Sequence, residues 1–194
     1  MVEFALVLPL LLVVLLGVVD FGRVFTAGIT MEAAARNAAE AAAQEYQQIL
    51  NSKPQPDAAD YQRLHDIALE ELCSEASSLP NRAVDGTGNC TMPVTAVCVH
   101  DEWGLDTLCG QPGTTPVPAE CSKVNGWLAE PPVPTNFSAP VPDPALIPVP
   151  YVEVRTCYHF TTLFNLHLQL PLNWSLNLGD IWMERDRQFV VGDY

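Results

Sequence analysis

The six cysteines are the residues of this sequence whose number and spacing bear most directly on chemistry. All of them follow the apolar N-terminal stretch, at Cys73, Cys90, Cys98, Cys109, Cys121 and Cys157. A metal site would need paired ligands at close spacing, but the sequence has no C-x-x-C, and seven residues separate Cys90 from Cys98. An even number of cysteines outside the cytoplasm favours disulfides instead. Spacing alone leaves the pairing open; we predict a Cys109–Cys121 disulfide across a proline-rich loop.

Motifs that would indicate catalysis or a cofactor are missing from the sequence. There is no G-x-S-x-G, no H-E-x-x-H and no glycine-rich phosphate loop. No C-x-x-C-H is present to attach a c-type haem. The histidines do not have the spacing of metal ligands, and Cys98-x-His100 alone does not make a site; they are His65, His100, His159 and His167. We therefore expect a protein that is not an enzyme and has no cofactor or metal.

The chain is strongly acidic, with 23 Asp and Glu against 9 Lys and Arg and a formal net charge of −14. This sign excludes nucleic acid as a partner, because affinity for phosphates comes mostly from Lys and Arg. No calcium-binding loop of the D-x-[DN]-x-[DN]-G type occurs. We interpret the acidity as a solvated surface that repels its neighbours.

An apolar segment near the N-terminus predicts membrane residence. Phe4–Val19 contains sixteen consecutive residues without a charge or a strongly polar side chain. As an α-helix it would span about 24 Å, slightly less than a hydrocarbon core of roughly 30 Å. Glu3 precedes the segment and no A-x-A-like cleavage site follows it, so we expect the segment to be retained rather than removed as a secretory signal.

The helical pattern continues well beyond this apolar segment. Residues 24–50 contain no proline and are rich in alanine, glutamate and glutamine, so one helix of roughly 70 Å is predicted from about Val2 to Leu50. The alanines either let another helix or the head approach closely, or only raise helix propensity.

Two residues within this helix carry a cost that needs an explanation. Pro9 removes a backbone hydrogen bond, and outside the first turns it would kink the helix. The Glu3 carboxylate is unfavourable in an apolar environment unless it is paired. Either Glu3 lies at the membrane interface near the positive end of the helix dipole, or it pairs with an N-terminal amine when helices pack together.

The segment Val2–Arg23, VEFALVLPLLLVVLLGVVDFGR, resembles the N-terminal signature of TadE-like and TadG-like proteins, the pilin-related subunits of tight-adherence (Flp-type) pili. The similarity covers the E-F-A-L-x-L-P start, the leucine run and the D-F-G-R end. A second, shorter stretch, Tyr151–Phe164, resembles a strand of the heads of that family.

This resemblance implies that a prepilin peptidase cuts after a glycine ahead of the segment and that Glu3 assists recruitment into the pilus. No glycine and no basic leader precede Glu3 in this sequence. The candidate assembly residues are those of the motif: Glu3, Phe4, Pro9, Asp20 and Arg23.

The rest of the chain predicts a compact head. Residues 57–77 repeat Tyr61, Leu64, Ala68 and Leu72 at helical spacing, which indicates an amphipathic helix with Cys73 near its end. Alternating patterns predict a mostly antiparallel sheet, with strands at 93–99, 149–163, 166–170, 174–178 and 181–191. Residues 112–150 contain eleven prolines, which predicts an irregular surface loop.

These observations predict an α+β protein with a helix at residues 1–52 and a disulfide-bearing head at residues 53–194. The expected function is that of a structural subunit whose helices bundle into an extracellular pilus for surface attachment. The alternative is a minor pseudopilin that stays in the inner membrane as an assembly factor. The expected partners are further copies of the chain, the prepilin peptidase and the inner-membrane assembly machinery. The expected location is the inner membrane before assembly and the cell surface afterwards.

Overall fold

The computed structural model describes part of the chain in detail. Backbone is described for residues 2–53, 55–86, 88, 90–100, 109–110, 117–129, 150–163, 167–170, 174–177 and 179–191. Within these ranges, side chains are not described for residues 2–6, 9–10, 109–110, 126–129, 167–170 and 174–177.

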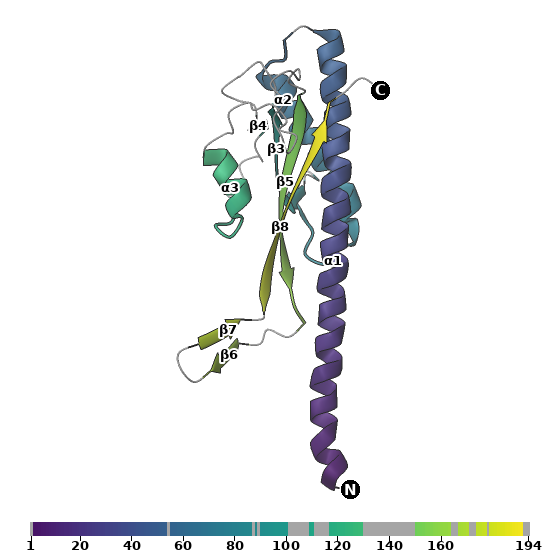
Figure 1. The fold of residues 1–194 in the computed structure, drawn as a ribbon, viewed down its shortest axis with the longest axis vertical. Coiled ribbons are helices and arrows are strands. Elements are labelled where there is room, and N and C mark those ends of the chain that lie inside the picture. The colour runs from purple at the N-terminus through teal and green to yellow at the C-terminus, as the bar shows by residue number, and fades with distance from the viewer. Residues whose placement is uncertain are drawn as a thin grey trace, which may run out of the picture.

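One long helix forms the spine of the molecule (Figure 1). Helix α1 runs from Val2 to Ser52 without a break, including position 9. It ends where the Ser52 hydroxyl and the Lys53 amide both donate to the Ile49 carbonyl, at 2.8 and 3.0 Å. The N-terminal half of α1 projects beyond the head, whereas the C-terminal half lies along it. The predicted continuous helix is confirmed.

The second helix packs antiparallel against the C-terminal half of α1. Helix α2 (Ala58–Glu75) begins with a capping box, in which Asp57 accepts from the Ala59 and Asp60 amides and Asp60 accepts from the Asp57 amide. The hydrogen bond from Lys53 is the main cause that lowers the pKa of the Asp57 carboxyl, and hydrogen bonds from the backbone amides lower it further. A short 3-10 turn, η1 (Ala76–Ser78), follows α2. The buried face of α2 includes the four residues predicted for it, Tyr61, Leu64, Ala68 and Leu72.

A four-stranded antiparallel sheet lies against both helices. Its strands are β3 (Val94–His100), β4 (Cys109–Gly110), β5 (Tyr151–Thr161) and β8 (Asp180–Val190). They pair in the order β4-β3-β5-β8. Two small two-stranded sheets accompany it, β1 (Ala83–Val84) with β2 (Cys90–Met92), and β6 (His167–Leu170) with β7 (Trp174–Asn177). The predicted antiparallel sheet is confirmed, and the five predicted strands correspond to β3, β5, β6, β7 and β8.

The main core lies between the sheet and the two long helices. Val97, Val99, Val152 and Val154 pack with the alanines of α1 and the apolar face of α2. Ala34, Ala38 and Ala42 are fully buried, so their small side chains let the sheet and α2 approach the α1 backbone closely. The alanine run therefore serves packing as well as helix propensity.

The other face of the sheet carries a helix that the sequence analysis did not predict. Helix α3 (Ser122–Ala129) lies inside the segment expected to be an irregular loop. The prolines of that segment fall before residue 119 and after residue 130, which leaves a proline-free stretch long enough for two helical turns. The α3 residue Val124 packs on Ala96, Cys98 and Cys157 of the sheet. Apart from residues 117–129 and 150, the proline-rich stretch is outside the described residues.

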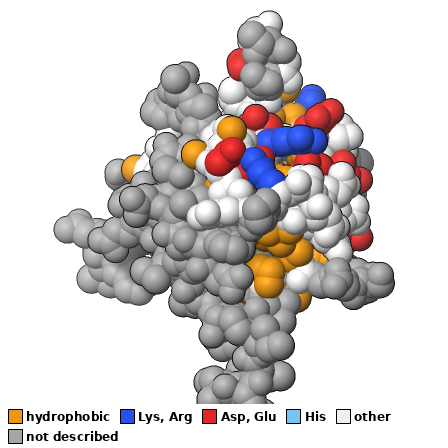
Figure 2. Space-filling view, turned by 90° about the horizontal axis from the view of Figure 1, so that it is seen from above, with side chains coloured by type: hydrophobic (Ala, Val, Ile, Leu, Met, Phe, Trp, Pro, Cys, Tyr) orange, Lys and Arg blue, Asp and Glu red, His pale blue; other side chains and the backbone are white. Residues whose placement is uncertain are grey.

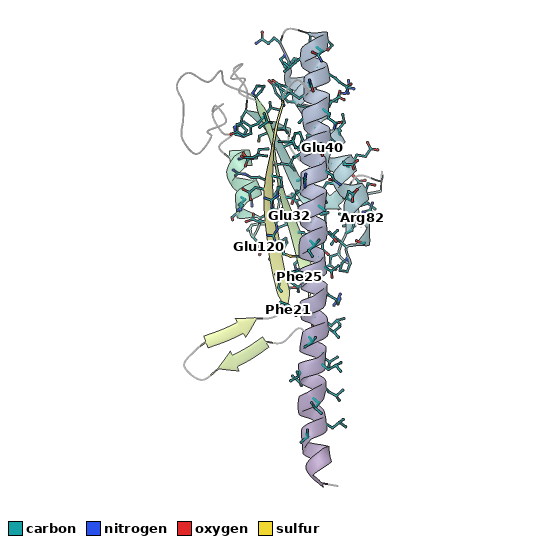
Figure 3. All side chains as sticks on the ribbon, turned by 45° about the vertical axis from the view of Figure 1, so that its right-hand side comes forward. Phe21, Phe25, Glu32, Glu40, Arg82 and Glu120 are labelled. Carbon is teal, nitrogen blue, oxygen red and sulfur yellow. A yellow bond between two sulfur atoms is a disulfide. The ribbon has the colours of Figure 1, made fainter. Side chains whose placement is uncertain are left out.

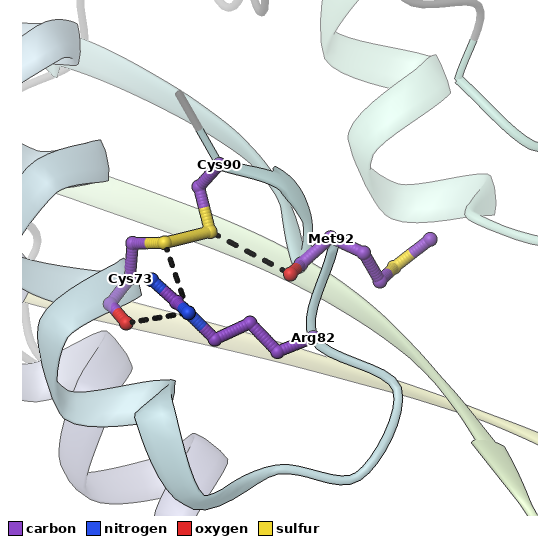
Figure 4. Close-up of a disulfide and its surroundings, with 4 residues drawn as sticks. All are labelled: Cys73, Arg82, Cys90 and Met92. Carbon is purple, nitrogen blue, oxygen red and sulfur yellow. Dashed lines mark hydrogen bonds between the residues drawn. A yellow bond between two sulfur atoms is a disulfide. The ribbon is translucent and has the colours of Figure 1, made fainter. Parts of the chain in front are cut away.

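Disulfides connect α2 and the residue before α3 to strands of the head. Cys73 of α2 is bonded to Cys90 of β2, and Cys121, just before α3, is bonded to Cys157 of β5. The predicted Cys109–Cys121 pair is therefore wrong, because Cys157 faces Cys121 across the sheet surface that α3 covers. Cys98 is also disulfide-bonded, and Cys109 is its direct neighbour in the register of β3 and β4. Beside the first bridge, Arg82 Nε donates to the Cys73 carbonyl at 3.2 Å (Figure 4).

Non-reducing peptide mapping of the secreted or membrane-held chain is expected to recover linked peptides for Cys73–Cys90 and Cys121–Cys157. A third linked pair, Cys98–Cys109, is expected from the register of β3 and β4. Recovery of six free thiols, or of a Cys109–Cys121 peptide, would contradict this arrangement of the head.

The replacement Ala38→Leu is expected to lower the free energy of unfolding by about 1–3 kcal/mol, because extra methyl groups overpack a filled core. Ala38 is fully buried between α1, α2 and the sheet. The control is Ala33→Leu, at an exposed position of the same helix, for which a change within about 0.5 kcal/mol is expected. Urea unfolding of both variants in the same detergent measures the difference, and equal losses would show that the alanine face is not tightly packed.

Candidate assembly and membrane interface

The N-terminal half of α1 exposes apolar side chains on all of its sides. From Leu11 to Leu15 five consecutive large apolar residues are exposed, and consecutive residues point in different directions around a helix. The described part of this helix from Leu11 onward is long and apolar enough to cross a membrane. Such a surface is stable in lipid or between other apolar helices, and not in water.

The first charged residues after the apolar segment mark the start of the head. Asp20 and Arg23 form an ion pair one turn apart, with Arg23 Nη1 at 3.2 Å from Asp20 Oδ1. The same Asp20 oxygen accepts from the Leu163 backbone amide at 3.0 Å. We call residues 20–23 the neck, because here α1 is tied to the end of β5.

Arg23 also connects the neck to the core of the head. Its guanidinium lies 5.3 Å from the centre of the buried Phe160 ring, a cation–π distance. Next to Phe160 in this cluster is Tyr158, whose hydroxyl accepts from the Asn81 amide at 3.1 Å. Burial raises the pKa of the Tyr158 phenol above its usual value. A groove of about 480 Å³ lies between α1 and η1, and its lining includes Arg23, Thr26 and Phe160.

A second set of charges fixes the head along α1 above the neck. Glu32 of α1 pairs with Arg187 and, at 3.6 Å, with Arg185, both on β8. Further up, Arg63 of α2 pairs with Glu45 of α1 at 2.8 Å. Seen from above, the described surface of the head shows acidic and basic side chains side by side (Figure 2). These contacts hold the head in one orientation on the helix.

A stripe of apolar residues continues along α1 beyond the neck. Phe21, Phe25 and Ile29 are spaced four residues apart, so they lie on one face of the helix. Their exposed fractions are 73%, 62% and 55%, and the sticks of Figure 3 show Phe21 and Phe25 at the level where the head begins. We call these three residues the phenylalanine stripe. The sequence analysis missed it, although its spacing after Asp20 is visible in the sequence.

The residues predicted for assembly separate into two groups. Asp20 and Arg23 come together at the neck. Glu3, Phe4 and Pro9 belong to the backbone of α1, but their side chains are outside the described residues. The structure therefore gives no partner for Glu3, and its role stays a prediction.

One buried polar cluster lies away from this interface. His100 Nε2 is 3.1 Å from Glu153 Oε2, its ring stacks on Tyr151 at 4.3 Å, and Arg155 Nε donates to Glu153 at 3.1 Å. Arg155 thereby compensates the charge of the buried Glu153 carboxylate within the central strand β5. Among the described residues, no group of three or more His, Cys, Asp or Glu side chains is placed to hold a metal ion.

The structure combines one long helix, apolar in its first half, with an antiparallel β-sheet head on its second half. A family model described as TadE-like protein matches residues 1–40. The match is confined to this N-terminal segment, which is similar to that of TadE-like proteins, a family of the Tad pilus system. The search of curated proteins and the search of solved structures returned no match.

Proposed function

We propose that this chain is a structural subunit of a Tad-type pilus, with the N-terminal helices packed in the filament core and the acidic heads on the outside. In this proposal the chain is held in the inner membrane by α1 before assembly. The prepilin peptidase and the inner-membrane assembly machinery then act on it, and it ends in an extracellular fibre used for surface attachment.

The phenylalanine stripe is the observation that favours a filament. If the neck charges Asp20 and Arg23 lie at the membrane surface, Phe21, Phe25 and Ile29 lie at or above it, outside the hydrocarbon. Lipid then covers the stripe incompletely, and exposed apolar side chains of this size indicate an interaction surface. Neighbouring helices in a filament core cover the stripe and the apolar segment together.

The second candidate is an assembly factor that stays in the membrane. The exposed apolar segment from Leu11 to Val19 supports it, because a single anchoring helix explains that segment without any filament. In this case the stripe contacts another component of the machinery.

Electron microscopy of sheared surface material, with mass spectrometry of its subunits, separates the two candidates. If this chain is a structural subunit, it is expected to be a regular component of the purified fibres. If fibres disappear when the gene is deleted but purified wild-type fibres contain only traces of this chain, the assembly-factor function is supported instead.

The double variant Phe21→Ser/Phe25→Ser tests the stripe itself. We expect it to remain in the membrane, because Phe4–Val19 is unchanged, and to be poorly incorporated into fibres. Gln48→Ser is the matched control, an exposed position of the same helix far from the stripe. Incorporation of the double variant at the control level would show that helix packing does not use this face.

A further inference from the structure

The β6–β7 hairpin has one apolar and one polar face. In its register Leu168 is opposite Leu176, and Leu170 is opposite Trp174. Opposite residues share a face, and faces alternate along each strand. The four apolar residues therefore belong to one face, whereas the other face has His167, Gln169, Ser175 and Asn177.

This hairpin stands apart from the rest of the head. Figure 1 shows it beyond the ends of β5 and β8, separate from the four-stranded sheet. Among the described elements, β6 and β7 make their main contacts with each other. A two-stranded hairpin alone is at best marginally stable in water, so its apolar face needs a surface to pack on.

The position of the hairpin brings it to the level of the membrane. Two residues after the end of β5, the Leu163 amide donates to Asp20 of the neck at 3.0 Å. From there the hairpin extends sideways, away from α1, at the height of the apolar half of that helix (Figure 1). Leu163, at its entry, is itself 58% exposed.

The charge pattern fits a lipid surface. In a chain with net charge −14, residues 156–179 contain no Asp, Glu, Lys or Arg. The acidic head is repelled by anionic headgroups, whereas this uncharged segment is not. Tryptophan prefers the membrane–water interface, where its ring is partly buried and its N–H stays hydrated.

We propose that the apolar face of the β6–β7 hairpin, with Leu168, Leu170, Trp174 and Leu176, lies in the interfacial layer of the membrane in which α1 is anchored. The hairpin stays at the interface, because the unpaired edges of two strands cannot be satisfied in the hydrocarbon core. Together with α1 it forms a second contact that fixes the tilt and rotation of the head on the membrane. This inference rests on membrane anchoring by α1 and is independent of whether the chain later enters a filament.

Quenching of tryptophan fluorescence by brominated lipids tests the contact in the full chain reconstituted into vesicles. We expect bromolipids to quench part of the emission, and Trp174→Phe to remove most of that quenchable part. Trp182→Phe is the control, because Trp182 stacks on His159 of the head at a centroid distance of 4.5 Å. This variant is expected to leave the quenchable part of the emission in place. If bromolipids quench the same amount of emission in Trp174→Phe as in wild type, the proposal is wrong.

Two double variants that add charge test which face of the hairpin contacts the membrane. Leu168→Glu/Leu176→Glu places two carboxylates on the apolar face, and His167→Glu/Asn177→Glu places two at the adjacent register position on the polar face. We expect only the first variant to lose quenching of Trp174, with the head disulfides intact in both. Equal quenching in the two variants would overturn the assignment of the face. A further outcome is that Trp174 is not quenched in vesicles and that its emission shifts only when fibres form. This outcome would assign the hairpin to a contact with a neighbouring copy and would also overturn the proposal.

Discussion

Deletion of residues 1–25 is expected to turn the chain into a soluble, folded monomer that is no longer anchored in membranes. The described side chains of the deleted segment are largely exposed, and the buried core of α1 starts at Ala27. The head loses the contacts of Asp20 with Leu163, of Arg23 with Phe160, and of Val24 with the apolar cluster around Phe160. It keeps the alanine face of α1, the sheet and the disulfides, so folding should survive.

Flotation with vesicles and size-exclusion chromatography measure this change. The full chain is expected in the floating fraction, and the truncated chain in the soluble fraction at monomer size with its disulfides formed. Ala38→Leu in the full chain is the matched control, because it destabilises the head but leaves membrane binding unchanged. If the truncated chain still polymerised into the same fibres, helix packing would not be the basis of assembly.

Much of this fold follows from local patterns in the sequence. The proline-free run up to Leu50 predicts α1 almost to its end at Ser52. The spacing of Tyr61, Leu64, Ala68 and Leu72 predicts the buried face of α2. These features depend on neighbours within a few residues, so periodicity is sufficient to find them.

Features that depend on distant contacts were not predictable in the same way. The alternation in β5 indicates one buried face, yet Glu153 and Cys157 on the other face are also buried. For Cys157 the reason is α3, a short helix in a proline-rich segment whose composition indicates a loop. Without α3 on the sheet, nothing in the sequence distinguishes a Cys121–Cys157 disulfide from Cys109–Cys121.

The neck contacts depend on such distant residues. The D-F-G-R motif marked Asp20 and Arg23, its first and last residues, as candidate assembly residues, but it did not indicate their contacts with the head. The hydrogen bond from Leu163 to Asp20 joins residues 143 positions apart, and no local signal indicates it. The phenylalanine stripe could have been found, since Phe21, Phe25 and Ile29 follow a helical repeat directly after the first charge.

Glu3→Gln is expected to reduce incorporation into fibres strongly and to leave membrane insertion intact. An unpaired carboxylate in a packed apolar core costs several kcal/mol, so in a filament the Glu3 carboxylate needs a positive partner, such as an N-terminal amine of the same or a neighbouring subunit. Glutamine keeps the shape of the side chain and loses the charge. Insertion should not suffer, because removing a charge from an apolar helix makes it easier to insert.

The measurement is the ratio of fibre-assembled to membrane-held protein, compared at equal expression for wild type, Glu3→Gln and Glu40→Gln. Glu40→Gln makes the same change in α1 beside the head, where Gln44 Nε2 donates to the Glu40 carboxylate at 3.4 Å. This variant is expected to assemble like wild type. A low ratio for Glu3→Gln alone supports a charge pair inside the helix bundle. If Glu3→Gln assembles as efficiently as Glu40→Gln, Glu3 is an interfacial carboxylate near the positive end of the α1 dipole, and its charge has no part in packing subunits together.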